Sequence, residues 1–277
     1  MATAFKIALD HLDIYQLVFY ASLSSAVVLI IPVCFGAHLN LLLKTLRQHW
    51  RYSIMMACLN PTLYYIVLFS AYDRLPAQVA QPINYTWAIV LTFMSVIFLK
   101  QKPSRLDFLA AFICYTGVIV IATSGEAEIL NDIDYLGITL AIISTFVWAG
   151  YWILNVQDKR DQRVAMCINF LIALPLSAFI CGVFSNFSIP VEGAIGAGYI
   201  GIFEMGLAFL FWSKALRLTN NTSRVSTLIF LSPFLSLFFI SQILEETIQS
   251  TTYVGLVVIV VGLTIQRIKP NSENQPS

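Results

Sequence analysis

The sequence has few charged residues and only three histidines. Charged residues make up 11% of the 277 positions, whereas a soluble domain of this size carries roughly 25%. The formal net charge is +1, so the chain lacks the basic excess that nucleic-acid-binding proteins show. The scarcity of charge excludes an ordinary water-soluble domain and argues against a nucleic-acid partner.

Motifs for metal binding, redox chemistry and nucleotide hydrolysis are also missing. The five cysteines lie inside apolar runs without a C-x-x-C pair, and His11, His38 and His49 have no ligand spacing. A chelating site needs such a cluster, so we expect no metal and no cofactor. The sequence has no P-loop, no H-E-x-x-H motif and no Ser/His/Asp grouping. ATP hydrolysis therefore cannot power this protein.

Long apolar runs are abundant instead. Hydrophobic residues make up 58% of the chain, and they form runs of about 20 residues, the length of a helix that crosses a bilayer. The sequence therefore predicts an all-α, polytopic membrane protein. The predicted spans are 14–35, 52–72, 79–99, 108–125, 135–156, 164–185, 194–216, 224–244 and 251–268.

One stretch of the sequence occurs twice. Residues 99–117 end one apolar run, turn and begin the next, and residues 244–262 repeat this layout 145 residues later. The turn is basic in the first copy and acidic in the second, which is typical of copies that cross a membrane in opposite directions. We expect two inverted five-helix repeats, at 1–125 and 135–268. The aligned pairs are Leu99 with Leu244, Phe108 with Tyr253, Ala110 with Gly255 and Gly117 with Gly262.

The first helix is expected to be truncated. Shifting the span 135–156 back by 145 residues places its start before Met1 and its end near residue 11. Residues 1–9 would then be the outer end of a helix whose beginning is absent, because either the start site is set too late or most of one helix is lacking. The expected number of transmembrane helices is accordingly nine to ten.

The distribution of Lys and Arg predicts the orientation, because positively charged loops stay in the cytoplasm. If the loop at 36–51 is inside, only Lys6 and Arg74 of the 16 Lys and Arg residues fall outside. The acidic residues of 126–134 then fall outside as well. This orientation places the C-terminal tail, 269–277, in the cytoplasm.

Two stretches carry a resemblance to a known family. Residues 70–87 and 204–216, together with the repeated segments, are similar to EamA-type permeases of the drug/metabolite transporter superfamily. The segment 83–87, Ile-Asn-Tyr-Thr-Trp, is most similar to the branch that exports aromatic amino acids. The resemblance implies ten helices in a bacterial inner membrane, a central cavity between inverted halves, alternating access and a small-molecule substrate.

Glu204 is the one acidic residue deep within a predicted span. A carboxylate at membrane depth is costly unless it is neutral, paired or facing water, so it is a functional candidate by default. Its counterpart in the first repeat, at a shift of 144, is Asn60. We expect Glu204 to contact a substrate amine or to couple transport to protons. The alternative is a packing group that hydrogen-bonds a neighbouring backbone.

Prolines and aromatic residues mark the rest of the candidate site. Pro61 and Pro82 interrupt helical hydrogen bonds near Asn60 and Asn84, and carbonyl groups freed in this way can line a cavity. Aromatic residues gather near these breaks, which predicts a stacking surface for an amphipathic solute; the alternative is interfacial belts and lipid-facing bulk. The predicted substrate-binding residues are Asn60, Tyr64, Asn84, Tyr85, Trp87, Trp148, Tyr151, Glu204 and Trp212.

These features predict a secondary transporter that exports a small metabolite, such as an amino acid, by alternating access, with proton coupling through Glu204 as one option. A membrane-embedded enzyme would need a catalytic pair at membrane depth, and the spans hold one acid and no histidine, so no enzymatic activity is expected. A non-transporting scaffold is the third alternative. Small-residue stripes such as 137–149 favour packing within the bundle, with a homodimer as the minority interpretation.

Overall fold

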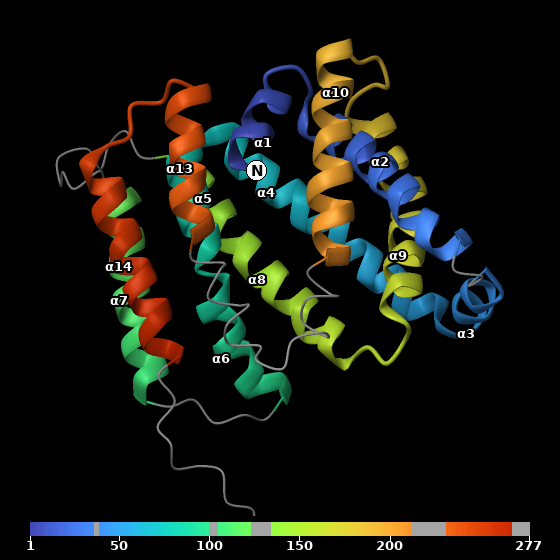
Figure 1. Ribbon diagram of the computed structural model, residues 1–277, viewed down its shortest axis with the longest axis horizontal. Coiled ribbons are helices and arrows are strands. Elements are labelled where there is room, and N and C mark those ends of the chain that lie inside the picture. The colour runs from blue at the N-terminus through green and yellow to red at the C-terminus, as the bar shows by residue number, and fades with distance from the viewer. Residues whose placement is uncertain (36–38, 100–104, 123–133, 212–230, 268–277) are drawn as a thin grey trace, which may run out of the picture.

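The computed structural model describes residues 1–35, 39–99, 105–122, 134–211 and 231–267, and every regular element in these ranges is helical (Figure 1). The all-α fold expected from the sequence is thus confirmed. The elements are α1 (Ala2–Leu9), α2 (Ile14–Phe35), α3 (Leu39–Ala57), η1 (Cys58–Leu63), α4 (Tyr64–Arg74), α5 (Ala77–Tyr85), α6 (Trp87–Leu99), α7 (Arg105–Ala122), α8 (Tyr135–Gln157), α9 (Gln162–Phe184), α10 (Val191–Tyr199), η3 (Ile200–Ala208), α13 (Leu231–Ile243) and α14 (Ser250–Arg267), where η denotes a π-helical segment.

Apolar helices of membrane-spanning length dominate the described chain. Length and composition alone already qualify five of its helical spans as membrane-crossing. Such a helix satisfies its own backbone hydrogen bonds, which is the condition for lying in lipid. The five spans are Ile14–Phe35, Leu39–Arg74, Tyr135–Asn155, Gln162–Phe184 and Val191–Phe211.

The structure corrects the prediction of a loop at 36–51, because α3 begins at Leu39. The segment is helical because Leu39, Leu43 and Leu46 recur at helical spacing, while polar residues such as Lys44 and Arg47 interrupt the apolar run. Its average hydropathy is low, so a search for continuous apolar runs misses it. The helix changes direction at His49, where the backbone leaves helical geometry (φ −127°, ψ 22°).

The predicted span 79–99 is divided into α5 and α6 at Thr86. The Thr86 hydroxyl donates to the Ile83 carbonyl oxygen at 2.7 Å, and Pro82 lies inside α5. A proline removes one helical hydrogen bond and favours a change of direction. The ends of the predicted spans 194–216 and 224–244 lie outside the described residues.

The repeated stretch forms one tightly packed helix pair, α7 against α14 (Figure 1). A Cβ built on Gly117 would lie 2.6 Å from the Gly255 carbonyl oxygen, and one on Gly262 would lie 2.9 Å from the Ala110 carbonyl oxygen. Because Gly117 corresponds to Gly262 and Ala110 to Gly255 in the repeat, the shift of 145 residues converts the first of these contacts into the second. A pair of antiparallel helices whose contacts are exchanged in this way is related by a twofold axis perpendicular to both helices. The two repeats are therefore inverted, as the sequence predicts.

The other helix pairs follow the same symmetry. Under the shift of 145 residues, α1 corresponds to 147–154 of α8, α2 to α9, and α3 with η1 to α10 with η3. Accordingly, α2 packs against α10 and η3 as α9 packs against α3 and η1. The two repeats interdigitate, so their equivalent faces enclose a common centre.

We expect Gly117→Ala to destabilise the protein by about 1–3 kcal/mol, the usual cost of overpacking. The added methyl group would press against the Gly255 backbone, which cannot move aside as a side chain can. Gly150→Ala is the matched control, since its Cβ would lie 3.6 Å from the flexible end of Met94. Thermal unfolding in detergent measures both variants, and equal melting temperatures would contradict the proposed close packing.

The short helix α1 is held firmly in the bundle. The Lys6 ammonium donates to the carbonyl oxygens of Tyr72 and Leu75, at 2.8 and 3.2 Å, which lie at the end of α4. The Phe5 ring packs edge-on against Phe69 and Tyr72, with centroids 5.1 and 5.3 Å apart. These contacts place the start of α1 at the centre of the molecule.

Candidate central cavity

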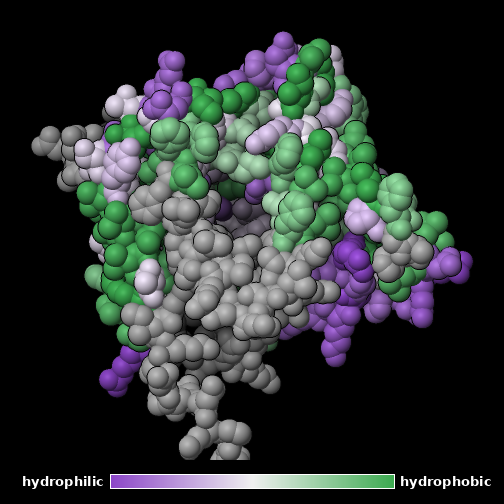
Figure 2. All heavy atoms as spheres, in the orientation of Figure 1, coloured by the Kyte–Doolittle hydropathy of each residue, from purple (hydrophilic) through white to green (hydrophobic). Residues whose placement is uncertain are grey.

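A cavity of about 320 Å³ lies at the centre of the described bundle. Figure 2 shows the molecule hollowed near its middle, with hydrophilic atoms inside the hollow and hydrophobic residues on its flanks. Helices of both repeats contribute to its wall, as their interdigitation requires. The described lining residues are Met1, Ala2, Phe5, Tyr64, Leu68, Tyr72, Gln81, Asn84, Tyr85, Trp87, Trp148, Trp152, Glu204, Ala208 and Phe209.

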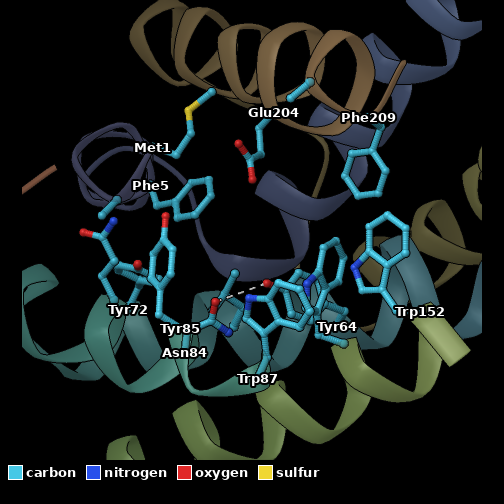
Figure 3. Close-up of a pocket in the computed structure, with 15 residues that line it drawn as sticks. Met1, Phe5, Tyr64, Tyr72, Asn84, Tyr85, Trp87, Trp152, Glu204 and Phe209 are labelled. Carbon is cyan, nitrogen blue, oxygen red and sulfur yellow. Dashed lines mark hydrogen bonds between the residues drawn. The ribbon is translucent and has the colours of Figure 1, made fainter. Parts of the chain in front are cut away.

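Glu204 is the only charged side chain among the described lining residues. It extends from η3 into the cavity, toward the aromatic residues of α4 and α5 (Figure 3). It forms no ion pair within 4 Å with a described residue; the Met1 ammonium, farther away, attracts it electrostatically. A carboxylate in this position is available to a cation or to a proton.

The two residues that the repeat aligns, Asn60 and Glu204, both lie in π-helical segments. η1 runs over Cys58–Leu63 and η3 over Ile200–Ala208, so the widened turns occupy equivalent positions in the two repeats. A π-helical turn is rare and occurs mostly at functional sites, because it redirects side chains and alters backbone hydrogen bonding. Both repeats therefore have irregular helical backbone at equivalent positions, which are those of Asn60 and Glu204.

Asn60 does not line the cavity. Its backbone is extended (φ −144°, ψ 121°), and its side chain is 1% exposed. The amide lies beside the Tyr151 hydroxyl but makes no hydrogen bond of normal geometry within the described structure. Tyr151 is also buried, underneath Trp148, with its ring centroid 5.7 Å from that of Trp148. These two residues support the wall of the cavity rather than forming its surface.

Trp148 is the centre of an aromatic cluster at one side of the cavity. The Tyr64 ring stacks on it, with a centroid distance of 4.3 Å and an interplanar angle of 26°. Trp152 and Phe209 meet it edge-on, at 5.8 and 5.6 Å. Stacked and edge-on pairs are the favoured aromatic arrangements. The cluster therefore forms a flat aromatic surface, with two further rings set perpendicular to Trp148.

Asn84 connects α5 with α8 and α4. Its amide nitrogen donates to the Ser144 hydroxyl at 2.8 Å, and its amide oxygen accepts from the Tyr64 hydroxyl at 3.5 Å (Figure 3). Gln81, one turn earlier on α5, also lines the cavity, and its amide oxygen has no hydrogen-bond partner among the described residues. α5 therefore contributes one hydrogen-bonded amide to the cavity wall, and the Gln81 amide oxygen nearby is buried.

The structure brings together six of the nine predicted site residues. Trp212 lies outside the described residues, and Asn60 and Tyr151 lie behind the wall. The prediction omitted Phe5, Tyr72, Gln81, Trp152 and Phe209. Phe209 follows Glu204 by five residues, which the widened turn of η3 brings to the same face. The six residues that line the cavity are Tyr64, Asn84, Tyr85, Trp87, Trp148 and Glu204.

Hydrogen bonds join the two repeats at the end of the bundle where α13 turns into α14. There the Glu246 carboxylate accepts from the backbone N–H groups of Ala77 and Gln78, at 3.1 and 3.4 Å. The Gln78 side-chain oxygen accepts from the Gln249 N–H and the Thr252 hydroxyl, both at 3.2 Å. The start of α5, in the first repeat, is thus fastened to the α13–α14 turn of the second.

Comparison with known proteins identifies the family. The model of the EamA-like transporter family matches this chain twice, over residues 1–123 and 135–266. The chain belongs to this family. The EamA-like protein is therefore a multi-pass membrane transporter of the drug/metabolite type, and the resemblance deduced from the sequence is confirmed.

Curated relatives agree with this assignment. The EamA-like protein is 24% identical over 274 residues to an uncharacterized transporter of Archaeoglobus fulgidus, a match that covers 95% of this chain and 91% of the relative. It is 25% identical to the inner membrane protein YtfF of Escherichia coli, with 81% and 78% of the two chains covered. One solved crystal structure has the same fold, with a TM-score of 0.68 and 17% identity over 96% of this chain and 94% of the other.

Proposed function

We propose that this EamA-like transporter is a secondary transporter that exports a small amphipathic solute by alternating access. The observation that carries the proposal is the position of Glu204, the only carboxylate among the described residues that line an aromatic cavity between the two inverted repeats. Inverted repeats around a central site allow the protein to open to either side by similar movements. Export follows from the resemblance to amino-acid exporters, and the positive-inside distribution supports a cytoplasmic C-terminus.

Glu204 offers a physical basis for proton coupling. A free carboxylate is unfavourable at this depth, so Glu204 is stable either as the protonated acid or when paired with a positively charged solute. A single carboxylate cannot be protonated and paired with a positively charged solute at the same time. Loading of the solute on one side would release a proton, and rebinding of a proton on the other side would release the solute.

In this proposal, opening of the bundle at the α13–α14 turn breaks the contacts of Glu246 and Gln78 with the neighbouring repeat. We expect Glu246→Ala to increase amide hydrogen exchange at Ala77 and Gln78 about fivefold, since a lost helix-capping acceptor costs about 1 kcal/mol. Exchange measured by mass spectrometry reports this opening directly.

The adjacent Glu245, which is exposed, provides the matched control. Glu245→Ala removes the same charge from the same turn and is expected to leave exchange at the start of α5 unchanged. If both variants accelerate exchange equally, the effect comes from the turn as a whole, and the specific closure by Glu246 is refuted.

Purified protein in proteoliposomes tests the function itself. We expect a loaded solute to leave the vesicles chemically unchanged, faster than from protein-free vesicles, and with a rate that depends on the pH gradient. Mass spectrometry of the released solute separates transport from catalysis. A chemically altered solute would favour a membrane-embedded enzyme, and no movement of any solute in a metabolite mixture would favour a scaffold.

A further inference from the structure

We infer that the protein holds the headgroup of an anionic phospholipid in a second pocket, between α3 and the turn that joins α8 to α9. The pocket has a volume of about 550 Å³, and its described wall comes from 41–52 of α3 and from 157–161. It shares no described lining residue with the central cavity. The inference goes beyond the proposed function and is independent of it, because it concerns a contact with the membrane rather than a transported solute.

Two lysines supply the free charge of this pocket. Lys44 lies on α3 and Lys159 in the α8–α9 turn, and both are exposed. Neither forms an ion pair with a described residue. An ammonium group is a compact point charge with three donors, and its charge-assisted hydrogen bonds to phosphate oxygens are roughly twice as strong as neutral ones. The lysines therefore favour a ligand that carries a phosphate group.

The acidic residues of the pocket wall are already neutralised. The Asp158 side chain is 8% exposed and pairs with Arg160, with 2.6 Å between Oδ2 and Nη2. The Asp161 carboxylate pairs with Arg163 at 3.4 Å and accepts from two backbone N–H groups at the start of α9. Because an arginine matches each acid, the described wall keeps the positive charge of the two lysines.

The two sides of the pocket are joined to each other within the protein. The Arg160 guanidinium donates to the Ser53 hydroxyl on α3 and lies over the Tyr52 ring, 5.0 Å from its centroid. The Tyr52 hydroxyl donates to the Leu154 carbonyl oxygen of α8 at 2.7 Å. These contacts hold α3 against α8 and the turn, so a ligand does not have to bring the two lysine-bearing elements together. Such preorganisation lowers the cost of binding.

The pocket lies at a surface of the membrane. The α8–α9 turn connects two candidate membrane spans, Tyr135–Asn155 and Gln162–Phe184, so it emerges from the bilayer. The helical span Leu39–Arg74 has 36 residues, whereas about 20 residues cross the hydrocarbon core. The start of this span lines the pocket together with the turn, so this part of α3 lies at the level of the lipid headgroups.

The start of α3 also has the composition of a helix in the membrane interface. The basic residues Lys44, Arg47 and Arg51 lie among exposed apolar ones such as Leu41 and Trp50. Figure 2 shows hydrophilic residues in the region of α3 beside hydrophobic ones on the flank of the bundle. Trp and basic residues of this kind locate at the boundary between headgroups and acyl chains. A soluble anion would use the charges alone, whereas a phospholipid would also cover Leu41, which lines the pocket.

Native mass spectrometry of the purified protein in detergent tests the inference. Phosphatidylglycerol and phosphatidylcholine with identical acyl chains differ in headgroup charge, and we expect the first to bind at least tenfold more tightly. Lys44→Gln and Lys159→Gln should each weaken phosphatidylglycerol about fivefold, the effect of one basic residue at an anionic lipid surface, and the double variant about twentyfold. Arg105→Gln is the matched control, because it removes one exposed charge from α7, at the opposite side of the bundle from α3 (Figure 1). It should leave the affinity unchanged.

Equal binding of the two lipids would overturn the inference, as would phosphatidylglycerol affinity that the double variant retains or that Arg105→Gln lowers as much as Lys44→Gln does. Lys44→Arg keeps the charge and should retain the affinity; an equal loss in Lys44→Arg and Lys44→Gln would trace the effect to packing and refute the charge contact. Glycerophosphoglycerol, the same headgroup without acyl chains, should leave the lipid bound at millimolar concentration. If it displaces the lipid, the pocket takes a soluble phosphate compound and the assignment to a lipid is wrong.

Discussion

Glu204→Gln is expected to remove the pH dependence of transport and to lower solute flux at least tenfold. Glutamine keeps the size of the side chain but can neither release a proton nor carry a negative charge. Because Glu204 is the only charged side chain in the described wall of the cavity, no other described lining side chain can take over that role. Flux in proteoliposomes, measured between pH 6 and pH 8 with and without a pH gradient, gives both quantities.

Two variants make this result specific. Glu192→Gln removes an acid from the exposed first turn of α10 and should retain wild-type flux and pH dependence. Glu204→Asp keeps the charge on a shorter side chain and should retain the pH dependence at reduced flux. A Glu204→Gln protein whose flux still varies with pH as in the wild type would exclude coupling through this carboxylate.

The fold was readable from the sequence because two strong signals agree. Apolar runs of membrane length identify the helices, and the repeat at 99–117 and 244–262 identifies the symmetry, which the contact of Gly117 with Gly255 confirms. The amphipathic start of α3 escaped this approach, since polar and charged residues interrupt its apolar residues before they reach the length of a membrane span. Hydropathy averages over a window and therefore loses a pattern that one helix face would reveal.

The candidate site was only partly readable, because its geometry depends on irregular backbone. Asn60 is extended within an otherwise helical span, so its side chain leaves the face that a period of 3.6 residues assigns to it. The π-helical turn of η3 likewise brings Phe209 to the face of Glu204. Phe5 escaped notice because residues 1–9 are too short to span a membrane, although they pack deep in the bundle. Sequence spacing predicts which parts of the helices lie near the site, but it does not predict which side chains point into the cavity.

Trp148→Ala is expected to weaken solute binding at least tenfold, while Trp148→Phe retains most of it. Tyr64, Tyr151, Trp152 and Phe209 all contact the Trp148 ring, so its loss removes the flat wall and leaves its neighbours without support. Phenylalanine restores a smaller stacking surface. Calorimetry with tryptamine, an aromatic amine, measures the affinity. Thermal unfolding of each variant measures the accompanying loss of stability, which should be smaller than the roughly 3–5 kcal/mol of a fully buried Trp→Ala change, because Trp148 is partly buried.

Phe146→Ala is the control that distinguishes loss of the aromatic cavity wall from a general disturbance of α8. Phe146 lies on α8 two residues before Trp148, but its side chain is 50% exposed on the outside of the bundle. Its removal should leave tryptamine affinity unchanged. If Trp148→Ala binds tryptamine as tightly as Phe146→Ala does, the aromatic wall contributes no recognition energy. Solute selection would then depend on Glu204 alone, and aliphatic amines of the same length should bind equally well.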